Sequence, residues 1–86
     1  MRVTVQLFAR LRDLAGRGDL TCQVPDGATV RDVWAAVTAQ HPALAAYGAS
    51  VSCARNEDFA RMSDRVSDAD AIAFLPPVSG GAPVSR

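Results

Sequence analysis

The sequence predicts a single α+β domain in which one main helix covers one face of a mixed β-sheet. Three observations lead to this expectation. A central segment has the apolar spacing of an amphipathic helix, several short segments around it alternate between apolar and polar residues, and the chain has only 86 residues. That length allows one small core, and 49% hydrophobic residues are too many for a disordered chain. We expect residues 1–77 to form the domain and residues 78–86 to form a flexible tail.

The first and last strands are expected to lie side by side in the centre of the sheet. Residues 3–8 and 71–75 carry the clearest period-two alternation, with Ile72 and Phe74 on one face of the last strand. Residues 76–77 are both proline and end that strand, because proline cannot donate to a sheet ladder. If the two strands pair in parallel, the C-terminal tail leaves from one end of the sheet.

The main helix is expected to begin after Thr29 and to end near His41. Thr29 followed by Asp32 resembles a capping box, with Asp in place of the usual Glu. Pro42 disfavours the helical conformation in the residue before it, which ends the helix. Four apolar residues recur at helical spacing and form a stripe that we assign to the core: Val30, Val33, Trp34 and Val37.

Shorter elements are expected in the remaining segments. Residues 9–15 predict two helical turns that end at Gly16. The other short elements are strands over 20–24 and 51–55, an added helical turn over 42–47, turns over 56–58 and 67–70, and one or two short strands within 59–66.

Charge and hydropathy exclude several classes of function. Nine basic residues, all of them arginine, balance nine acidic residues, so the chain lacks the positive charge of a protein that binds nucleic acid or acidic membranes. No apolar run approaches the roughly 20 residues that span a bilayer. The alternating N-terminus also differs from the apolar block of a signal peptide. We therefore expect a cytoplasmic domain with no nucleic-acid or membrane partner.

No group of residues has the spacing of a catalytic or metal centre. His41 is the only histidine and lies at the expected helix end. Cys22 and Cys53 fall inside expected strands without a CxxC or Cys/His pattern, and we interpret both as reduced, packed side chains. Asp68 and Asp70 lie in an expected turn and are interpreted as solvated. We expect the chain itself to bind no metal and no cofactor.

The C-terminal tail is the unusual feature of the chain. Gly80 and Gly81 follow the stiff pair of prolines and form a thread without side chains. Such a thread can enter a narrow channel that any Cβ atom would block, while the folded body stays outside. Most Gly-Gly pairs near a terminus are only flexible, so the tail does not decide the function by itself.

Four segments of the chain resemble the molybdopterin synthase small subunit, a family of sulfur carriers with the β-grasp fold of ubiquitin. The resemblance covers residues 1–81 in one register and rests on residues 7–13 (LFARLRD), 25–32 (PDGATVRD), 54–57 (ARNE) and 68–81 (DADAIAFLPPVSGG). It implies a ubiquitin-like β-grasp fold, with the mixed sheet packed on the main helix and a flexible Gly-Gly tail.

The resemblance also implies a mechanism in which Gly81 bears sulfur and Gly80 gives the clearance for threading. A separate adenylyltransferase, similar to ubiquitin-activating enzymes, uses ATP to convert the terminal glycine into a transient glycyl-adenylate. Sulfur from a persulfide donor then gives a C-terminal thiocarboxylate. The tail enters the large synthase subunit, where sulfur passes to cyclic pyranopterin monophosphate during molybdenum cofactor biosynthesis. The family suggests a heterotetramer of two small and two large subunits, in which nucleotide, metal and pterin belong to the partners.

The same resemblance implies a docking surface next to the tail. Phe8, Phe59 and Leu75 would form an exposed apolar patch that both partner enzymes contact, with Arg12 as the polar contact and Val78 as part of the partner-binding set. The alternation along each strand supports the exposure of Phe8 and Leu75. Successive side chains point to opposite faces of a sheet, and each of these two residues falls on the face opposite to the apolar residues of its own strand. The alternative is that Phe8 and Phe59 are ordinary core residues.

The chain departs from the family pattern in two places. Ala69 stands where the family usually has glycine in its Asp-Gly-Asp turn. The chain also continues from Ala82 to Arg86, whereas the family normally ends at Gly-Gly, and an amide-linked Gly81 has no free carboxylate. Either the added residues are removed, or they belong to an appended or fused segment, or this copy carries no sulfur.

Three other functions remain open at this point. The chain could be a β-grasp carrier that supplies sulfur to thiazole or cysteine synthesis. It could be a ubiquitin-like modifier that is attached to protein lysines through the same glycine. It could also be an interaction domain without any chemistry at its terminus.

Overall fold

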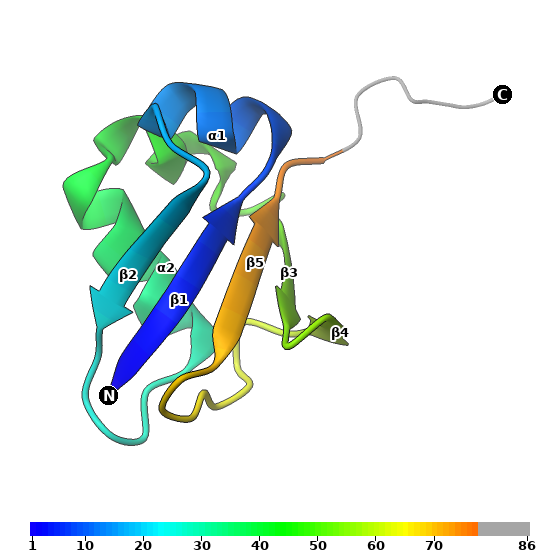
Figure 1. The fold of residues 1–86 in the computed structure, drawn as a ribbon. Helices are drawn as coiled ribbons and strands as arrows, with labels where there is room; N and C mark the ends of the chain where they lie inside the picture. Colours follow the sequence, from blue (N-terminus) through cyan, green and yellow to red (C-terminus); the bar gives the residue numbers. More distant parts are fainter. Residues whose placement is uncertain (78–86) are drawn as a thin grey trace, which may run out of the picture.

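The computed structural model describes residues 1–77, which form a mixed five-stranded sheet with the helices packed on one face (Figure 1). The elements in chain order are β1 (Arg2–Leu7), α1 (Ala9–Ala15), β2 (Asp19–Gln23), α2 (Val30–Gln40), the 3₁₀ helix η1 (Pro42–Tyr47), β3 (Ser52–Arg55), β4 (Asp58–Ala60) and β5 (Ala71–Leu75). The predicted two-layer α+β architecture is confirmed. None of the helices in this part of the chain has the length and hydropathy needed to cross a membrane.

The strands follow the order β2-β1-β5-β3-β4 across the sheet. β1 and β5 are parallel neighbours, with Val5 opposite Ile72 and Leu7 opposite Phe74, and the other neighbours are antiparallel. The expected central pair is therefore confirmed, and the topology is the ubiquitin-like β-grasp that the resemblance implied. Because β1 and β5 run in the same direction, both strands end on the side of the molecule from which the C-terminal segment leaves (Figure 1).

The hydrophobic core fills the space between the sheet and α2. The four residues of the predicted apolar stripe are all buried, at 7% exposure or less. Trp34 packs against Phe74 of β5, with the ring centroids 4.8 Å apart, which confirms its assignment to the core. The capping box is also formed, because the Asp32 amide donates to Oγ1 of Thr29 (3.4 Å) and the Thr29 amide donates to Oδ2 of Asp32 (2.9 Å).

Positive φ angles shape two of the connections between neighbouring elements. Gly16 ends α1 with a φ of +78°, as predicted from its position. Asn56 and Glu57 join β3 to β4 with φ angles of +51° and +74°, and positive values at both positions are typical of a type I′ hairpin turn. The ambiguous segment 59–66 contains the end of β4 and an isolated bridge from Arg65 to Thr29.

Candidate functional site

Three large apolar side chains are exposed within the described residues, and they are the three that the resemblance assigned to docking. Phe59 is 87% exposed, Phe8 43% and Leu75 39%. The alternative that Phe8 and Phe59 belong to the core is therefore wrong. We call these three residues the apolar face, and their contact with a partner remains a prediction.

Strand register explains why the apolar face points to solvent. Residues opposite each other in paired strands point to the same side, and Phe59 lies opposite Ala54 while Leu75 lies opposite Ser52. This is the side of the sheet that no helix covers (Figure 1). Phe8 follows β1 in an extended conformation (φ −119°, ψ 154°), so the alternation continues and turns its ring away from the core.

Phe8 and Leu75 line one groove at the end of the sheet where the C-terminal segment leaves. The groove has a volume of about 660 Å³, and its other walls come from α1, η1 and the end of β5: Ala9, Arg10, Tyr47, Pro76 and Pro77. Sequence reasoning missed Arg10 and Tyr47, because each lies in its own predicted helical segment and only the packing of α1 against η1 brings them together.

The backbone is strained where α1 begins beside this groove. Ala9 has a φ of +51°, a region that costs an L-residue about 1 kcal/mol or more. The turn is held by the Phe8 carbonyl, which accepts a hydrogen bond from the Leu11 amide at 3.1 Å. The left-handed Ala9 therefore lies directly between the extended Phe8 and the rest of α1.

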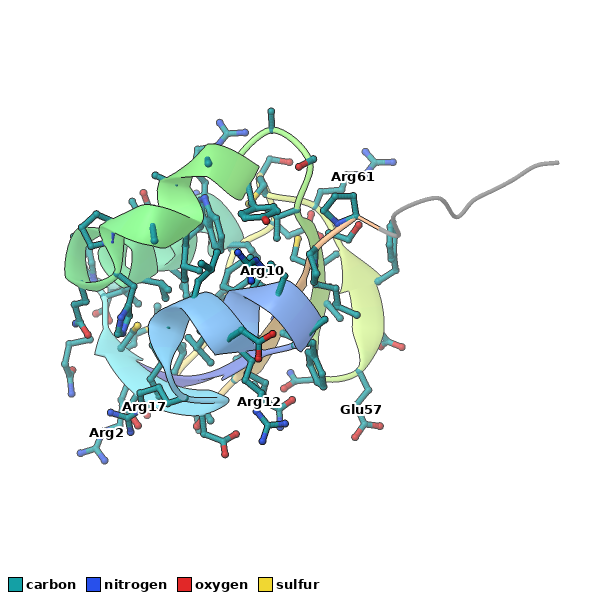
Figure 2. All side chains as sticks on the ribbon, turned by 90° about the horizontal axis from the view of Figure 1, so that it is seen from above. Arg2, Arg10, Arg12, Arg17, Glu57 and Arg61 are labelled. Carbon is teal, nitrogen blue, oxygen red and sulfur yellow. The ribbon has the colours of Figure 1, made fainter. Side chains whose placement is uncertain are left out.

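Arg12 lies beside Phe8 but on the other side of α1 from the groove. Figure 2 shows the side chains of Arg10 and Arg12 leaving α1 in opposite directions. Arg12 rests against Gly18, where an added Cβ would lie 3.4 Å from its Cδ and Nε atoms. Within residues 1–77 no carboxylate forms an ion pair with Arg12. The residues that share its hollow of about 220 Å³ are Gln6, Leu7, Phe8, Gly18 and Asp19.

The predicted site residues do not form one compact cluster. Phe59 lies on the edge strand β4, and β5 and β3 separate it from β1. The small side chains of Ala73 and Ala54 lie between Phe59 and the first strand on the same face, so the surface there is shallow. Three predicted site residues of the tail lie outside the described residues: Val78, Gly80 and Gly81.

A buried polar cluster at the start of β5 corrects one prediction. Asp70 was expected to be solvated, but it is only 7% exposed. Its carboxylate accepts hydrogen bonds from Arg55 Nε (2.5 Å), Asn56 Nδ2 (3.0 Å) and the Ser67 amide (2.6 Å). Burial alone raises the pKa of Asp70, but these hydrogen bonds and the charge of Arg55 outweigh burial and hold the pKa below its ordinary value of 3.8. Asp68 is exposed, as predicted.

The cluster joins two of the segments that carry the family resemblance, residues 54–57 and 68–81. Asn56 pairs with Ala71 through its backbone amide (2.8 Å) and accepts a hydrogen bond from the Ala71 amide on its side-chain oxygen (2.9 Å). The cluster thereby fixes the end of β5 that is far from the tail. We assign it a structural role, because it anchors the strand from which the tail extends.

The two cysteines have the properties of packed core residues. Cys22 is 2% exposed, Cys53 is 4% exposed, and both are free. Burial raises the pKa of both thiols, and the charge of Asp64 raises that of Cys53 further, so the unreactive thiol form is favoured. Among the described residues, no three His, Cys, Asp or Glu side chains gather as metal ligands would.

Comparison with known proteins adds independent findings on the family. The model of the ThiS family matches residues 5–81. A molybdopterin synthase sulfur carrier subunit from Chlamydomonas reinhardtii is 36% identical, and the match covers 94% of this chain and 100% of that protein. A molybdopterin synthase sulfur carrier subunit from Arabidopsis thaliana is also 36% identical, and the match covers 94% of this chain and 84% of that protein. The crystal structure of small archaeal modifier protein 1 from Haloferax volcanii is similar in fold, with a TM-score of 0.84 and 31% identity over 94% of this chain and 100% of its own.

Proposed function

Because the chain belongs to the ThiS family, we propose that it is the sulfur carrier subunit of a molybdopterin synthase. The observation that carries this proposal is the agreement with two molybdopterin synthase sulfur carrier subunits over 94% of the chain. The structure supports the proposal as well, because two of the three residues of the apolar face line a groove next to Pro76 and Pro77, from which the Gly-Gly tail continues. Exposed apolar surface of this kind marks an interaction site.

The proposed chemistry takes place at the carboxyl group of Gly81. A carboxylate oxygen attacks the α-phosphorus of ATP on the adenylyltransferase, and pyrophosphate leaves. The terminal sulfur of a persulfide donor then attacks the acyl carbon and expels AMP, and a thiol cleaves the remaining S–S bond to leave the thiocarboxylate. ATP and the persulfide are bound by the partners, and this chain contributes the acyl group.

The folded body positions the tail for that chemistry. Pro76 and Pro77 end β5 at the groove, so a partner that binds the apolar face holds the start of the tail in a defined place. Gly80 and Gly81 lack Cβ atoms and pass through a channel too narrow for other residues. Arg12 offers a guanidinium beside Phe8, which suits a carboxylate on the partner. Val78 extends the contact along the tail.

The proposed partners are the adenylyltransferase, the persulfide donor and the large synthase subunit. The tail enters the large subunit, and sulfur passes there to cyclic pyranopterin monophosphate. We propose two small and two large subunits in the assembly. The two partner enzymes bind the same face at different times, because one tail cannot occupy two active sites.

The test is reconstitution of molybdopterin formation with the adenylyltransferase and large subunit of the same organism. A chain of residues 1–81 is expected to gain the thiocarboxylate and support product formation, whereas Gly81→Ala in that chain is expected to give neither. Circular dichroism and Trp34 fluorescence check that the variant is folded. Normal molybdopterin formation by the Gly81→Ala chain would contradict the mechanism, and sulfur transfer to a thiazole or cysteine precursor alone would assign another pathway.

A second candidate function is protein modification through Gly81. The observation that favours it is the similarity to small archaeal modifier protein 1, which is 33% identical and covers 88% of this chain. The sequence has no lysine, so one copy of this chain offers no lysine to another copy. A modifier of this kind would therefore be attached to lysines of other proteins as single copies, and not as chains of copies joined through lysine. Mass spectrometry of cellular proteins for lysines linked to Gly81 tests this candidate.

A further inference from the structure

Arg10 is a charged residue in a groove whose other walls are uncharged. It lines the groove of about 660 Å³ together with Phe8, Leu75 and residues of η1 and of the end of β5, and no other residue of that lining carries a charge. The sequence resemblance gives Arg10 no role, because it assigns the polar contact to Arg12. Arg10 and Arg12 leave α1 in opposite directions, so the two guanidinium groups serve different parts of the surface (Figure 2).

Arg10 has no carboxylate partner in its own part of the chain. Among residues 1–77 the recorded ion pair joins Arg55 to Asp70 and does not involve Arg10. Residues 78–86 contain neither Asp nor Glu. The guanidinium keeps its charge at every physiological pH, and its side chain is exposed, so water solvates the charge in the free chain. A side-chain carboxylate that neutralises Arg10 must therefore come from another molecule.

Covering the groove changes the surroundings of this charge. The aromatic and aliphatic walls beside it exclude water once a partner lies over them. A charge that loses water without gaining an opposite charge costs free energy, whereas a charge that is paired at the same time costs much less. The groove therefore favours a partner with a carboxylate above Arg10 and disfavours a partner without one.

The walls of the groove are held in place before a partner binds. The Phe8 amide donates a hydrogen bond to the Phe74 carbonyl (3.3 Å), and the Tyr47 carbonyl accepts hydrogen bonds from the Ser50 amide (2.9 Å) and the Val51 amide (2.8 Å). Tyr47 also packs against the hydrophobic core. Docking on such a surface loses little conformational entropy, which leaves the choice of partner to shape and charge.

We propose that Arg10 is a specificity-determining residue of the carrier, which pairs with an Asp or Glu side chain of the large synthase subunit. An apolar side chain of that subunit enters the groove next to the carboxylate. This inference rests on the proposed function and adds the chemistry of the partner's contact surface. Phe8 and Leu75 belong both to the groove and to the apolar face, so a subunit that binds the apolar face also covers Arg10.

The experiment measures the affinity of the chain for the large subunit of the same organism by calorimetry, at low and at high salt. The variants are Arg10→Gln, Arg10→Glu and the matched control Arg2→Gln, which changes an exposed arginine at the start of β1, far from the groove. The full chain and the chain of residues 1–81 both serve as background, so the residues after Gly81 cannot hide the effect. Circular dichroism and Trp34 fluorescence check the fold of each variant.

We expect Arg10→Gln to weaken binding by about 30-fold at low salt and to reduce its salt dependence. Arg10→Glu should weaken binding further, because it places a carboxylate opposite a carboxylate. Arg2→Gln should leave the affinity and its salt dependence unchanged. In a second step, exposed Asp and Glu residues of the large subunit are changed to Arg one at a time, and one of these changes should restore the binding of Arg10→Glu.

The outcomes separate this inference from the proposed function. Equal affinities of the unchanged chain and Arg10→Gln would overturn the role of Arg10 and leave the carrier function in place. So would equal losses in Arg10→Gln and Arg2→Gln, or the failure of every charge change in the large subunit to restore binding. A dimer of the unchanged chain that Arg10→Glu abolishes would assign the groove to a second copy instead. If the unchanged chain does not bind the large subunit in either background, the proposed function itself fails.

Discussion

At the scale of single residues, Asp70 is the polar group on which the end of β5 depends. It is buried and is held by Arg55, Asn56 and the Ser67 amide. Asp70→Asn keeps the shape but removes the charge and leaves an amide nitrogen facing donors. We expect a loss of about 2 kcal/mol in the free energy of unfolding, measured by urea denaturation with Trp34 fluorescence. A change indistinguishable from zero would contradict the role of this cluster.

The same residue predicts the direction of the pH dependence of stability. The pKa of Asp70 is lower in the folded chain than its ordinary value of 3.8. Its contribution to stability is therefore fully present above that ordinary value and is lost as the pH falls through the lower pKa of the folded state. The stability difference between the native chain and Asp70→Asn should thus shrink in acid. A difference that stays constant to the lowest pH at which the chain folds would refute the assignment.

Ala69 predicts a gain in stability from a single change. Its φ is +69°, where an L-residue is strained and glycine is not. We expect Ala69→Gly to stabilise the fold by about 0.5–1 kcal/mol in the same denaturation assay. Ala71→Gly, two residues later in β5, is the control and should destabilise it. Equal losses in both variants would show that Ala69 is not strained.

At the scale of elements, the apolar face joins the end of β1, the edge strand β4 and the end of β5. Phe59 is 87% exposed, so its removal costs little core packing and isolates the docking contribution. In the chain of residues 1–81, we expect Phe59→Ala to weaken binding to the large subunit by at least about 30-fold, as for an interface hot spot. Calorimetry measures the affinity, and Gln23→Ala, exposed on β2 at the far end of the sheet, should leave it unchanged. Equal affinities for all three chains would remove Phe59 from the docking surface.

The elements that sequence reasoning predicted well are those whose signal is local. α2 follows from its apolar stripe and capping box, and β1 and β5 follow from their alternation, which also gave the exposure of Phe8 and Leu75. The burial of Asp70 could not be predicted in this way, because its partner Arg55 lies 15 residues earlier and only the pairing of β3 with β5 brings them together. The groove beside Tyr47 was missed for the same reason.

At the scale of the whole molecule, the body and the tail have separate tasks. All the buried residues of the hydrophobic core that the structure describes lie between Val3 and Phe74 in the sequence. We therefore expect residues 1–77 to fold alone, with an unfolding free energy within about 0.5 kcal/mol of the full chain. Denaturation of both chains measures this, and the shorter chain should support no sulfur transfer. A large loss of stability in residues 1–77 would show that the tail belongs to the fold.

The central claim is that Gly81 carries sulfur, and the most direct test is the intact mass of the chain purified from its own organism during molybdenum cofactor synthesis. Fragmentation should locate the C-terminus at Gly81, with part of the material carrying sulfur in place of one carboxylate oxygen. A chain that continues past Gly81 and shows no thiocarboxylate under these conditions would leave the β-grasp fold in place and contradict the carrier function.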